Sequence, residues 1–251
     1  GEGDSVNAII IGIGADIGRE IGLRLVRDDW RVTGTWYLNR PVEADFQRIA
    51  PIQDSACIRF VRCDLTSRVE VDQAAHRLAE PWDLLVFAAG TYEPLGPFMA
   101  CEEHEWEQCV NVNALAPLRL LRRLYPSRKP GASVAFFAGP HPTRANPTYS
   151  AYTAGKVILH KAVEDIQAET PDLKLFILGP GLTRTKMLAQ TIKAGHLAAY
   201  YTRVREFLDS GAQGSTFEDI YAMLRLCMDG EWARGRNIHI GDPWRTLTSL
   251  D

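Results

Sequence analysis

Residues 8–20 constrain the fold more than any other part of the chain. They begin with an apolar run at 9–11, break at Gly12, Gly14 and Gly18, and resume as a charged, amphipathic stretch. β-branched residues without polar neighbours are typical of a strand buried on both faces of a parallel sheet, and the later apolar residues recur at helical spacing. The segment therefore predicts a strand, a glycine turn and a helix.

The glycine turn also suggests a ligand. Glycines let the chain turn sharply and let a pyrophosphate approach the backbone, where the helix N-terminus supplies free N–H groups and a partial positive charge. A nucleotide-binding turn is the hypothesis. The alternative is that the glycines serve backbone geometry alone, because a single glycine motif is a weak signal.

Composition and charge narrow the class of protein. With 251 residues, 46% of them hydrophobic, the chain is expected to form a single domain, 1–251. A net charge of −3 gives no general basic surface for nucleic acid. No stretch approaches the roughly twenty apolar residues of a membrane span, and residues 1–4 lack the apolar core of a signal peptide. A cytoplasmic protein that binds neither nucleic acid nor membrane is expected.

The cysteines argue against a disulfide framework or a metal site. Their number, five, is odd, and no pair has CxxC spacing. Reduced, structural thiols are therefore expected, with no metal.

The second expected strand, at 30–35, bears on the choice of cofactor. In dinucleotide-binding folds an acidic side chain at the end of this strand accepts hydrogen bonds from a ribose 2′-hydroxyl, whereas an arginine suits a 2′-phosphate. Here no carboxylate appears before Glu43, and Arg40 lies close by. The sequence therefore favours NADP over NAD, with a solvated loop arginine as the alternative for Arg40.

A third strand is expected at 58–63, directly before Asp64 and Leu65. A carboxylate at the end of a strand can accept a hydrogen bond from an adenine amino group. It can equally cap the helix that is expected to begin near Ser67. Both interpretations of Asp64 stay open.

The fourth strand, 84–90, ends in the small residues Ala88, Ala89 and Gly90, and a fifth follows at 133–137. Small residues let a ligand lie against the backbone, although they also suit a crowded strand end.

A helical pattern at 106–125 contains Asn111 and Asn113 in its middle. Asparagine inside a helix competes for backbone hydrogen bonds, so two close together need a reason. Pro117 removes one helical hydrogen bond and is expected to bend the helix near Asn113.

Tyr152 and Lys156 begin another helix, which is expected to reach about Glu169. Four residues apart, they share one helical face. A nearby ammonium lowers the pKa of a phenol, which suits a tyrosine that exchanges a proton with an alcohol or carbonyl near pH 7. The alternative is a surface pair at a spacing that is common by chance.

Taken in order, these features resemble the short-chain dehydrogenase/reductase family over about residues 7–241. Residues 12–18 resemble its TGxxxGxG turn, residues 88–90 the end of its NNAG segment, and Tyr152 with Lys156 its YxxxK pair. Residues 180–185 resemble its PG-x-x-x-T loop along the nicotinamide. The resemblance implies these cofactor-binding residues: Gly12, Gly14, Asp16, Ile17, Gly18, Arg40, Asp64, Leu65, Ala88, Ala89, Gly90, Tyr152, Lys156, Pro180, Gly181, Thr183 and Thr185.

The resemblance also implies a fold and catalytic roles. The fold is α/β, a doubly wound parallel sheet (Rossmann fold) of about seven strands with helices on both faces. Tyr152 would be the general acid/base, Lys156 would hold the nicotinamide ribose and lower the tyrosine pKa, and Asn113 would keep a water in the proton relay. Members of this family commonly form homodimers or homotetramers, which is also expected here through the helices that contain Asn113 and Tyr152.

Three departures from the family pattern bear on function. Ile11 replaces the threonine of the glycine turn, and Asp16 its middle glycine, so a carboxylate lies near the expected pyrophosphate unless it turns away or caps the helix. Phe87 and Ala88 replace the two asparagines of NNAG. The family serine falls on Gly139, and losing such a hydrogen-bond donor costs on the order of a hundredfold in rate.

Candidates to replace that serine lie close to Gly139 in the sequence. His141 and Thr143 are in the same loop, and Ser150 is beside the tyrosine. Gly139, His141 and Thr143 are therefore the tentative substrate contacts, although a histidine between two prolines is also a common loop residue.

The C-terminal part resembles the family least. A helical lid over the substrate is expected at about 187–214, with basic and aromatic side chains that suit a polar or anionic substrate, or simply a solvated surface. A capping box at 215–218 is expected to open a helix through Cys227, and the last strand is expected at 237–240.

The sequence thus predicts an NADP-dependent oxidoreductase that interconverts a carbonyl and an alcohol of a small molecule. A non-catalytic nucleotide-binding protein, with a regulatory or assembly role, is the alternative, because Gly139 replaces the serine.

Overall fold

A seven-stranded parallel sheet organises the molecule, in the order β3-β2-β1-β4-β5-β6-β7. The computed structural model describes residues 5–38, 57–139 and 144–244. The strands are β1 (Asn7–Ile11), β2 (Arg31–Trp36), β3 (Ile58–Arg62), β4 (Trp82–Phe87), β5 (Arg128–Phe137), β6 (Lys174–Gly179) and β7 (Asn237–His239). The strand order reverses between β1 and β4, as in a doubly wound sheet, so the predicted Rossmann fold is confirmed.

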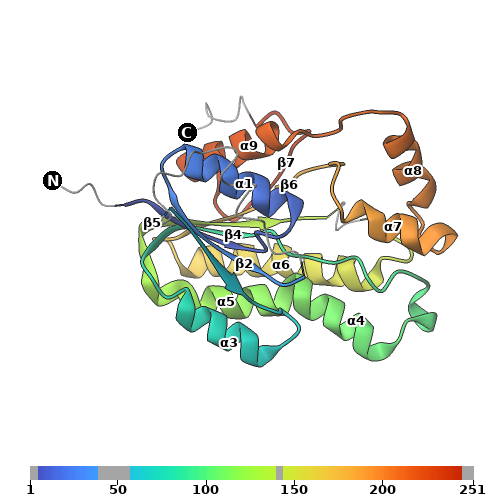
Figure 1. The fold of residues 1–251 in the computed structure, drawn as a ribbon, viewed down its shortest axis with the longest axis horizontal. Helices are drawn as coiled ribbons and strands as arrows, with labels where there is room; N and C mark the ends of the chain where they lie inside the picture. Colours follow the sequence, from blue (N-terminus) through green and yellow to red (C-terminus); the bar gives the residue numbers. More distant parts are fainter. Residues whose placement is uncertain (1–4, 39–56, 140–143, 245–251) are drawn as a thin grey trace.

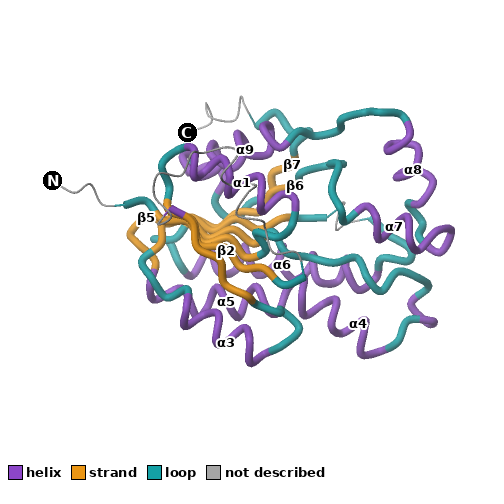
Figure 2. Tube along the Cα trace, in the orientation of Figure 1, coloured by secondary structure: helices purple, strands orange, loops and turns teal. Residues whose placement is uncertain are grey.

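Helices cover both faces of the sheet (Figures 1 and 2). On one face lie α1 (Asp16–Arg27) and α9 (Phe217–Asp229). On the other lie α3 (Arg68–Arg77), α4 (Glu103–Val110), α5 (Ala116–Leu124) and α6 (Ser150–Glu169). Two short helices, α7 (Leu188–Ala194) and α8 (Tyr201–Asp209), lie beyond the edge of the sheet, within the range predicted for the lid.

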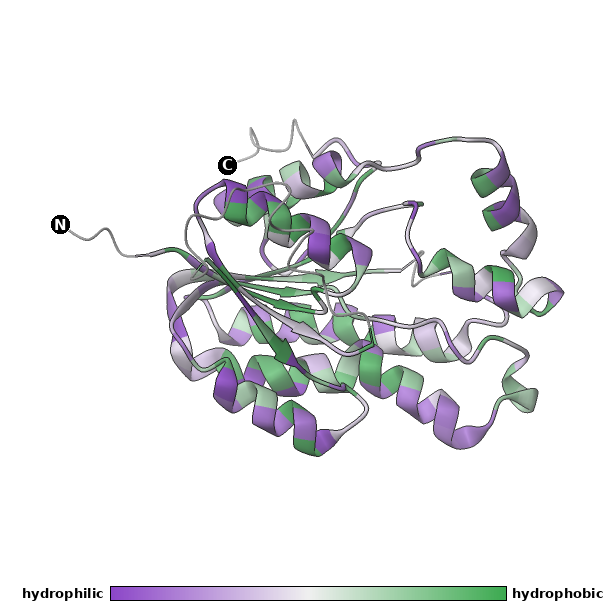
Figure 3. Ribbon diagram, viewed as in Figure 1, coloured by the Kyte–Doolittle hydropathy of each residue, from purple (hydrophilic) through white to green (hydrophobic). Residues whose placement is uncertain are grey.

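The first strand shows how one run of apolar residues serves two cores. Ile9 and Ile11 pack into the core beneath α3, α5 and α6, whereas Ala8 and Ile10 pack against α1 and α9. Alternate side chains of a strand point to opposite faces, so a strand inside this sheet is largely apolar on both faces. The hydrophobic colouring of the sheet and of the inward helix faces follows this pattern (Figure 3).

Several predicted boundaries are wrong by a few residues. β5 begins at Arg128, five residues before the expected start, and the buried strand β6 had no strand prediction of its own. The capping box belongs to Thr216 and Asp219, because the Thr216 hydroxyl accepts from the Asp219 N–H at 3.1 Å. Since short apolar runs carry little positional information, only the tertiary pairing sets these limits.

The predicted break near Asn113 is present as a π-helical turn, Asn111–Leu115, between α4 and α5. Pro117 lies in the first turn of α5 and has no N–H to donate to the Asn113 carbonyl four residues earlier. Such π turns often occur at functional sites.

Because all seven strands are parallel, their carboxyl ends meet at one edge. The glycine turn follows β1, residues 88–90 follow β4, Gly139 closely follows β5 and residues 180–187 follow β6. The topology therefore gathers at this edge segments that are far apart in the sequence. Within the described residues, no helix is long and apolar enough to cross a membrane.

Candidate functional site

The glycine turn packs tightly against the end of β4. Gly12 has a φ of +92°, and a Cβ there would lie 2.5 Å from the backbone nitrogen of Ala89. A Cβ on Gly18 would overlap the Gly12 carbonyl oxygen. Gly14 lies half-buried in the turn itself. Packing thus requires glycine at positions 12 and 18 whatever ligand the turn holds.

The N-terminus of α1 opens at this turn. Its N-cap is Ala15, and no side chain caps the helix. Asp16 does not cap the helix, so the capping alternative for this carboxylate is wrong. Instead it accepts a hydrogen bond from the backbone N–H of Lys186 at 2.5 Å and pairs with Arg19 at 3.1 Å.

Asp64 holds its own loop and does not cap α3. Its carboxylate accepts from the backbone N–H of Thr66 at 2.9 Å and from the Thr66 hydroxyl at 2.8 Å. It also hydrogen-bonds Tyr37 at the end of β2, and its negative charge raises the pKa of that phenol. The α3 cap is Ser67, whose hydroxyl accepts from the Glu70 N–H, so the capping alternative for Asp64 is wrong. Arg40 lies outside the described residues.

Asn113 is held between two glycines. Its side chain is 1% exposed and donates to the Thr91 carbonyl at 2.8 Å and the Cys109 carbonyl at 2.9 Å. A Cβ on Gly90 would lie 2.8 Å from the Asn113 Oδ1, and one on Gly155 would lie 2.9 Å from its Cβ. Gly155 is a packing position beside Asn113 that sequence reasoning missed, although a glycine inside the helix of Tyr152 and Lys156 was a visible signal.

Tyr152 and Lys156 lie on the buried face of α6, with the ammonium 5.5 Å from the centre of the tyrosine ring. Burial raises the pKa of Tyr152 well above its usual value, with smaller contributions from Tyr92 and Cys109. Burial also lowers the pKa of Lys156 to about 8. The expected lowering of the Tyr152 pKa is therefore wrong for this arrangement, because burial of the phenol disfavours its charged form.

Gly139 lies directly against the tyrosine. A Cβ at position 139 would lie 2.5 Å from the Tyr152 Oη and 2.7 Å from its Cζ. The phenol thus fills the space that a side chain at 139 would need. The Ser150 hydroxyl accepts from the Trp106 indole N–H at 3.0 Å, a contact that does not use its own proton. His141 and Thr143 lie outside the described residues.

Tyr92, which sequence reasoning missed, links this site to α7. Its ring packs edge-on against Tyr152 at 4.7 Å and against Tyr149 at 5.5 Å. From α7, Gln190 accepts from the Tyr92 N–H at 2.7 Å and Thr191 bonds the Tyr149 hydroxyl at 2.9 Å. These contacts join segments that are 42 to 98 residues apart, so no local pattern signals them.

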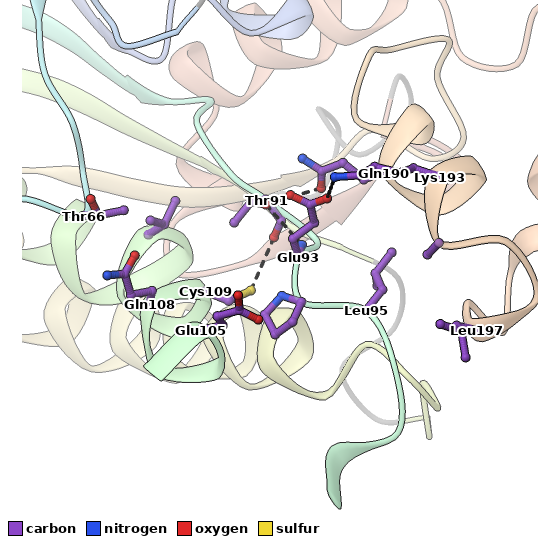
Figure 4. A pocket seen from close by; sticks show the side chains of 13 residues that line it. Thr66, Thr91, Glu93, Leu95, Glu105, Gln108, Cys109, Gln190, Lys193 and Leu197 are labelled. Atoms are coloured by element: carbon purple, nitrogen blue, oxygen red, sulfur yellow. Dashed lines mark hydrogen bonds and ion pairs between the residues drawn. The ribbon is translucent and has the colours of Figure 1, made fainter. Parts of the chain in front are cut away.

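A cavity of about 540 Å³ lies between α4, residues 91–95 and α7 (Figure 4). Thr91 and Glu93 point into it, whereas Tyr92 points the other way, toward Tyr152. Among the described residues, Tyr152 and Lys156 do not line this cavity. It therefore lies beside the tyrosine site, separated from it by residues 91–93.

The loop after β6 is held from within and from the lid. Gly181 has a φ of +67°, and the Thr183 hydroxyl donates to the Pro180 carbonyl at 3.3 Å. The Arg184 guanidinium donates to carbonyls at the end of α8 and just beyond it, at Phe207, Leu208 and Ala212. Thr185 lies half-buried in the same loop.

Two basic side chains of the lid, expected to suit an anionic substrate, already have acidic partners. Lys193 pairs with Glu93 at 3.0 Å across the cavity, and Arg205 pairs with Asp209 at 3.7 Å. Both pairs are exposed, so they are worth little stability. At these two positions the solvated-surface interpretation fits better.

Comparisons with known proteins agree with this geometry. The family model for short chain dehydrogenases matches residues 6–195. The short-chain dehydrogenase/reductase olcF of Penicillium canescens is 24% identical over 125 residues, which cover 48% of this chain and 45% of that protein. An uncharacterized oxidoreductase of Schizosaccharomyces pombe is 22% identical over 139 residues, or 54% of this chain and 56% of that protein. The chain thus spans about half the length of these curated relatives.

Solved structures share the fold over nearly the whole chain. A short-chain dehydrogenase/reductase from Saccharomyces cerevisiae superposes with a TM-score of 0.78 at 19% identity, covering 95% of this chain and 97% of that one. BdcA, solved in complex with NADPH, superposes with a TM-score of 0.74 at 17% identity, covering 95% of this chain and 94% of that one. Given the match of the family model to most of the sequence and the order of its strands, the chain belongs to the short chain dehydrogenase family.

Proposed function

We propose that this protein is an NADP-dependent oxidoreductase that interconverts a carbonyl and an alcohol of a small molecule. The observation that carries the proposal is the gathering of Tyr152, Lys156 and Asn113 in one buried cluster. The exposed fractions of these three side chains are 4%, 8% and 1%, respectively. Such deep burial is unusual for a lysine unless it has a role. Buried titratable groups with perturbed pKa values mark candidate active sites.

A dinucleotide fits the residues at the carboxyl edge of the sheet in most respects. The uncapped N-terminus of α1 leaves backbone N–H groups for a phosphate, and residues 88–90 carry no side chain larger than a methyl group. BdcA, which shares the fold, was solved with NADPH. Asp16 is the one residue of the turn whose charge opposes a phosphate.

The chain's own residues have distinct roles in the proposed reaction. Bound NADPH would supply the hydride. Tyr152, which its raised pKa keeps protonated, would donate its proton to the carbonyl oxygen, and Lys156 would hold the nicotinamide ribose. Asn113 would position a water that returns a proton to the tyrosine.

The absence of the family serine favours the alternative, a non-catalytic nucleotide-binding protein. With Gly139 at that position, the substrate oxygen would accept a hydrogen bond from the Tyr152 hydroxyl alone, without the second one that the family serine would donate. Retention of Tyr152, Lys156 and Asn113 in a buried cluster argues for altered chemistry and against lost chemistry, because each buried polar group costs stability.

The remaining assignments extend the same proposal. Helices α7 and α8 would cover a polar small-molecule substrate. Leu115 lies in the same turn as Asn113, and Val157 lies in the same helix as Tyr152. Their side chains are 44% and 41% exposed, which suits a homodimer or homotetramer through this surface.

Replacing the buried lysine tests the proposal. Lys156→Met should weaken NADPH binding at least about tenfold, because a charged donor to the ribose is lost. The same change should raise the free energy of unfolding at pH 7, by up to about 3 kcal/mol, since burial lowers the lysine pKa from 10.5 to about 8. Fluorescence titration with NADPH and NADH measures the first effect, and thermal or urea unfolding the second.

A rise in pH should change the stability of the protein and its affinity for NADPH in opposite directions. The folded-state pKa lies below the unfolded one, so the cost of the buried charge is full below pH 8 and is relieved as the pH rises from 8 to 10.5. NADPH binding by the wild type should weaken over the same rise. Lys161→Met, on the exposed side of α6, is the control and should change neither by more than about 0.5 kcal/mol. Equal NADPH binding by the wild type and Lys156→Met would contradict the proposed site.

The cofactor preference has its own test. Arg40→Ala should weaken NADPH binding about tenfold and leave NADH binding unchanged, because only NADPH carries the 2′-phosphate that an arginine would pair with. Arg31→Ala, at the opposite end of β2, is the matched control. If both dinucleotides lose affinity equally in Arg40→Ala, the 2′-phosphate contact is absent.

A further inference from the structure

Asp16 bridges two segments that a bound dinucleotide would also have to contact. It is the first residue of α1, in the glycine turn, and its side chain is only 9% exposed. Its partner Lys186 lies 170 residues later, in the loop between β6 and α7. A carboxylate oxygen of the glycine turn thus accepts a hydrogen bond from a backbone N–H of the β6–α7 loop.

The N-terminus of α1 favours negative charge, and the Asp16 carboxylate already supplies one there. The first turn of a helix presents N–H groups with no partner inside the helix and a partial positive charge. In α1 no side chain caps these groups. The Asp16 carboxylate lies beside them and pairs with Arg19. A second anion at the same place is therefore repelled by the carboxylate.

We infer that Asp16 is an internal anion that competes with the cofactor's pyrophosphate and holds the β6–α7 loop against the glycine turn. This inference rests on the proposed function. A dinucleotide would enter by displacing the carboxylate from the Lys186 N–H. Asp16 therefore sets the affinity of the cofactor, and binding is coupled to release of the loop that leads into α7.

The contacts of α7 limit how far that release extends. Gln190 accepts from the Tyr92 N–H and Lys193 pairs with Glu93, and neither contact involves Asp16. Thr183 and Arg184 also keep their own contacts, to Gly214 and to the end of α8. Loss of the Asp16 bond therefore loosens residues 185–187 and leaves the body of α7 in place.

Two variants separate the charge from the bond. Asp16→Asn removes the charge and keeps an acceptor for the Lys186 N–H, whereas Asp16→Gly removes both. Both should bind NADPH roughly tenfold more tightly than the wild type in a fluorescence titration. Only Asp16→Gly should speed amide hydrogen exchange in peptides that cover 183–190 of the free protein, by roughly two- to tenfold.

Glu20→Gln is the matched control. It removes a carboxylate one turn later in α1, where Glu20 pairs with Arg24 at 2.7 Å and does not contact the loop. Its NADPH affinity should stay within about twofold of the wild type.

The outcomes are distinguishable. If the wild type binds NADPH and the Asp16 variants bind it no more tightly, the inference is overturned and the proposed function stands. If amide hydrogen exchange at 183–190 is unchanged in Asp16→Gly, the inference that Asp16 holds the β6–α7 loop is overturned. If no form of the protein binds NADPH or NADH, the proposed function is overturned and the inference with it.

Discussion

Tyr152→Phe should abolish reduction of carbonyl substrates while NADPH binds as in the wild type. The substitution removes one oxygen and leaves the ring, whose edge contact with Tyr92 at 4.7 Å and fit against Gly139 stay in place. Loss of a positioned proton donor costs about 10² to 10⁴ in rate. We expect a decrease in kcat of about 10³, measured as the oxidation of NADPH with a panel of aldehydes and ketones.

Tyr149→Phe makes the same chemical change at a neighbouring tyrosine. Its hydroxyl bonds Thr191 at 2.9 Å, so the expected effect is a loss of about 1 kcal/mol in stability with little change in kcat. Near-normal turnover by Tyr152→Phe would remove the phenol from the mechanism. Weaker NADPH binding by the same variant would show that the hydroxyl contributes to the cofactor site instead.

Gly139→Ser, which restores the residue type of the family, should fail to raise activity. The new Cβ would lie 2.5 Å from the Tyr152 Oη, well inside van der Waals contact, so either the phenol or the loop must move. Overpacking of this kind costs about 1 to 3 kcal/mol in stability. We expect a lower melting temperature and a kcat below that of the wild type.

Gly139→Ala adds the same Cβ without the hydroxyl and separates the two effects. If Tyr152 is displaced by the Cβ, both variants should lose stability and activity to a similar extent. A Gly139→Ser variant that turns over faster than the wild type, with an unchanged melting temperature, would show that the tyrosine moves aside easily and that only a hydroxyl was missing.

Much of the architecture is readable from local sequence. The apolar run before Gly12 and the helical stripe after Gly18 predicted β1 and α1, because burial on both faces of a parallel strand leaves no polar position. Pro117 predicted the irregular turn at Asn113, since a proline lacks the N–H that the helix needs. The four-residue spacing of Tyr152 and Lys156 placed both on one face of α6.

Chemistry at the site depends on contacts that sequence spacing does not encode. The direction of the Tyr152 pKa was predicted wrongly because a spacing of four residues says nothing about how deeply the fold buries the phenol. Part of its surroundings, such as the ring of Tyr92, comes from another segment. Likewise, Gly139 looked like a missing side chain, whereas the fold fills that space with the phenol of Tyr152.

By itself, the sequence determined the alternation of strands and helices apart from β6, the glycine turn and the residues that the family pattern marks. Only the tertiary structure decided that Asp16 reaches the Lys186 N–H, that Tyr92 packs on Tyr152 and that Gly155 admits Asn113. The physical reason is that periodicity and turn chemistry act over a few residues. The parallel sheet, in contrast, brings the ends of β1, β4, β5 and β6 to one edge, where residues up to 170 positions apart touch.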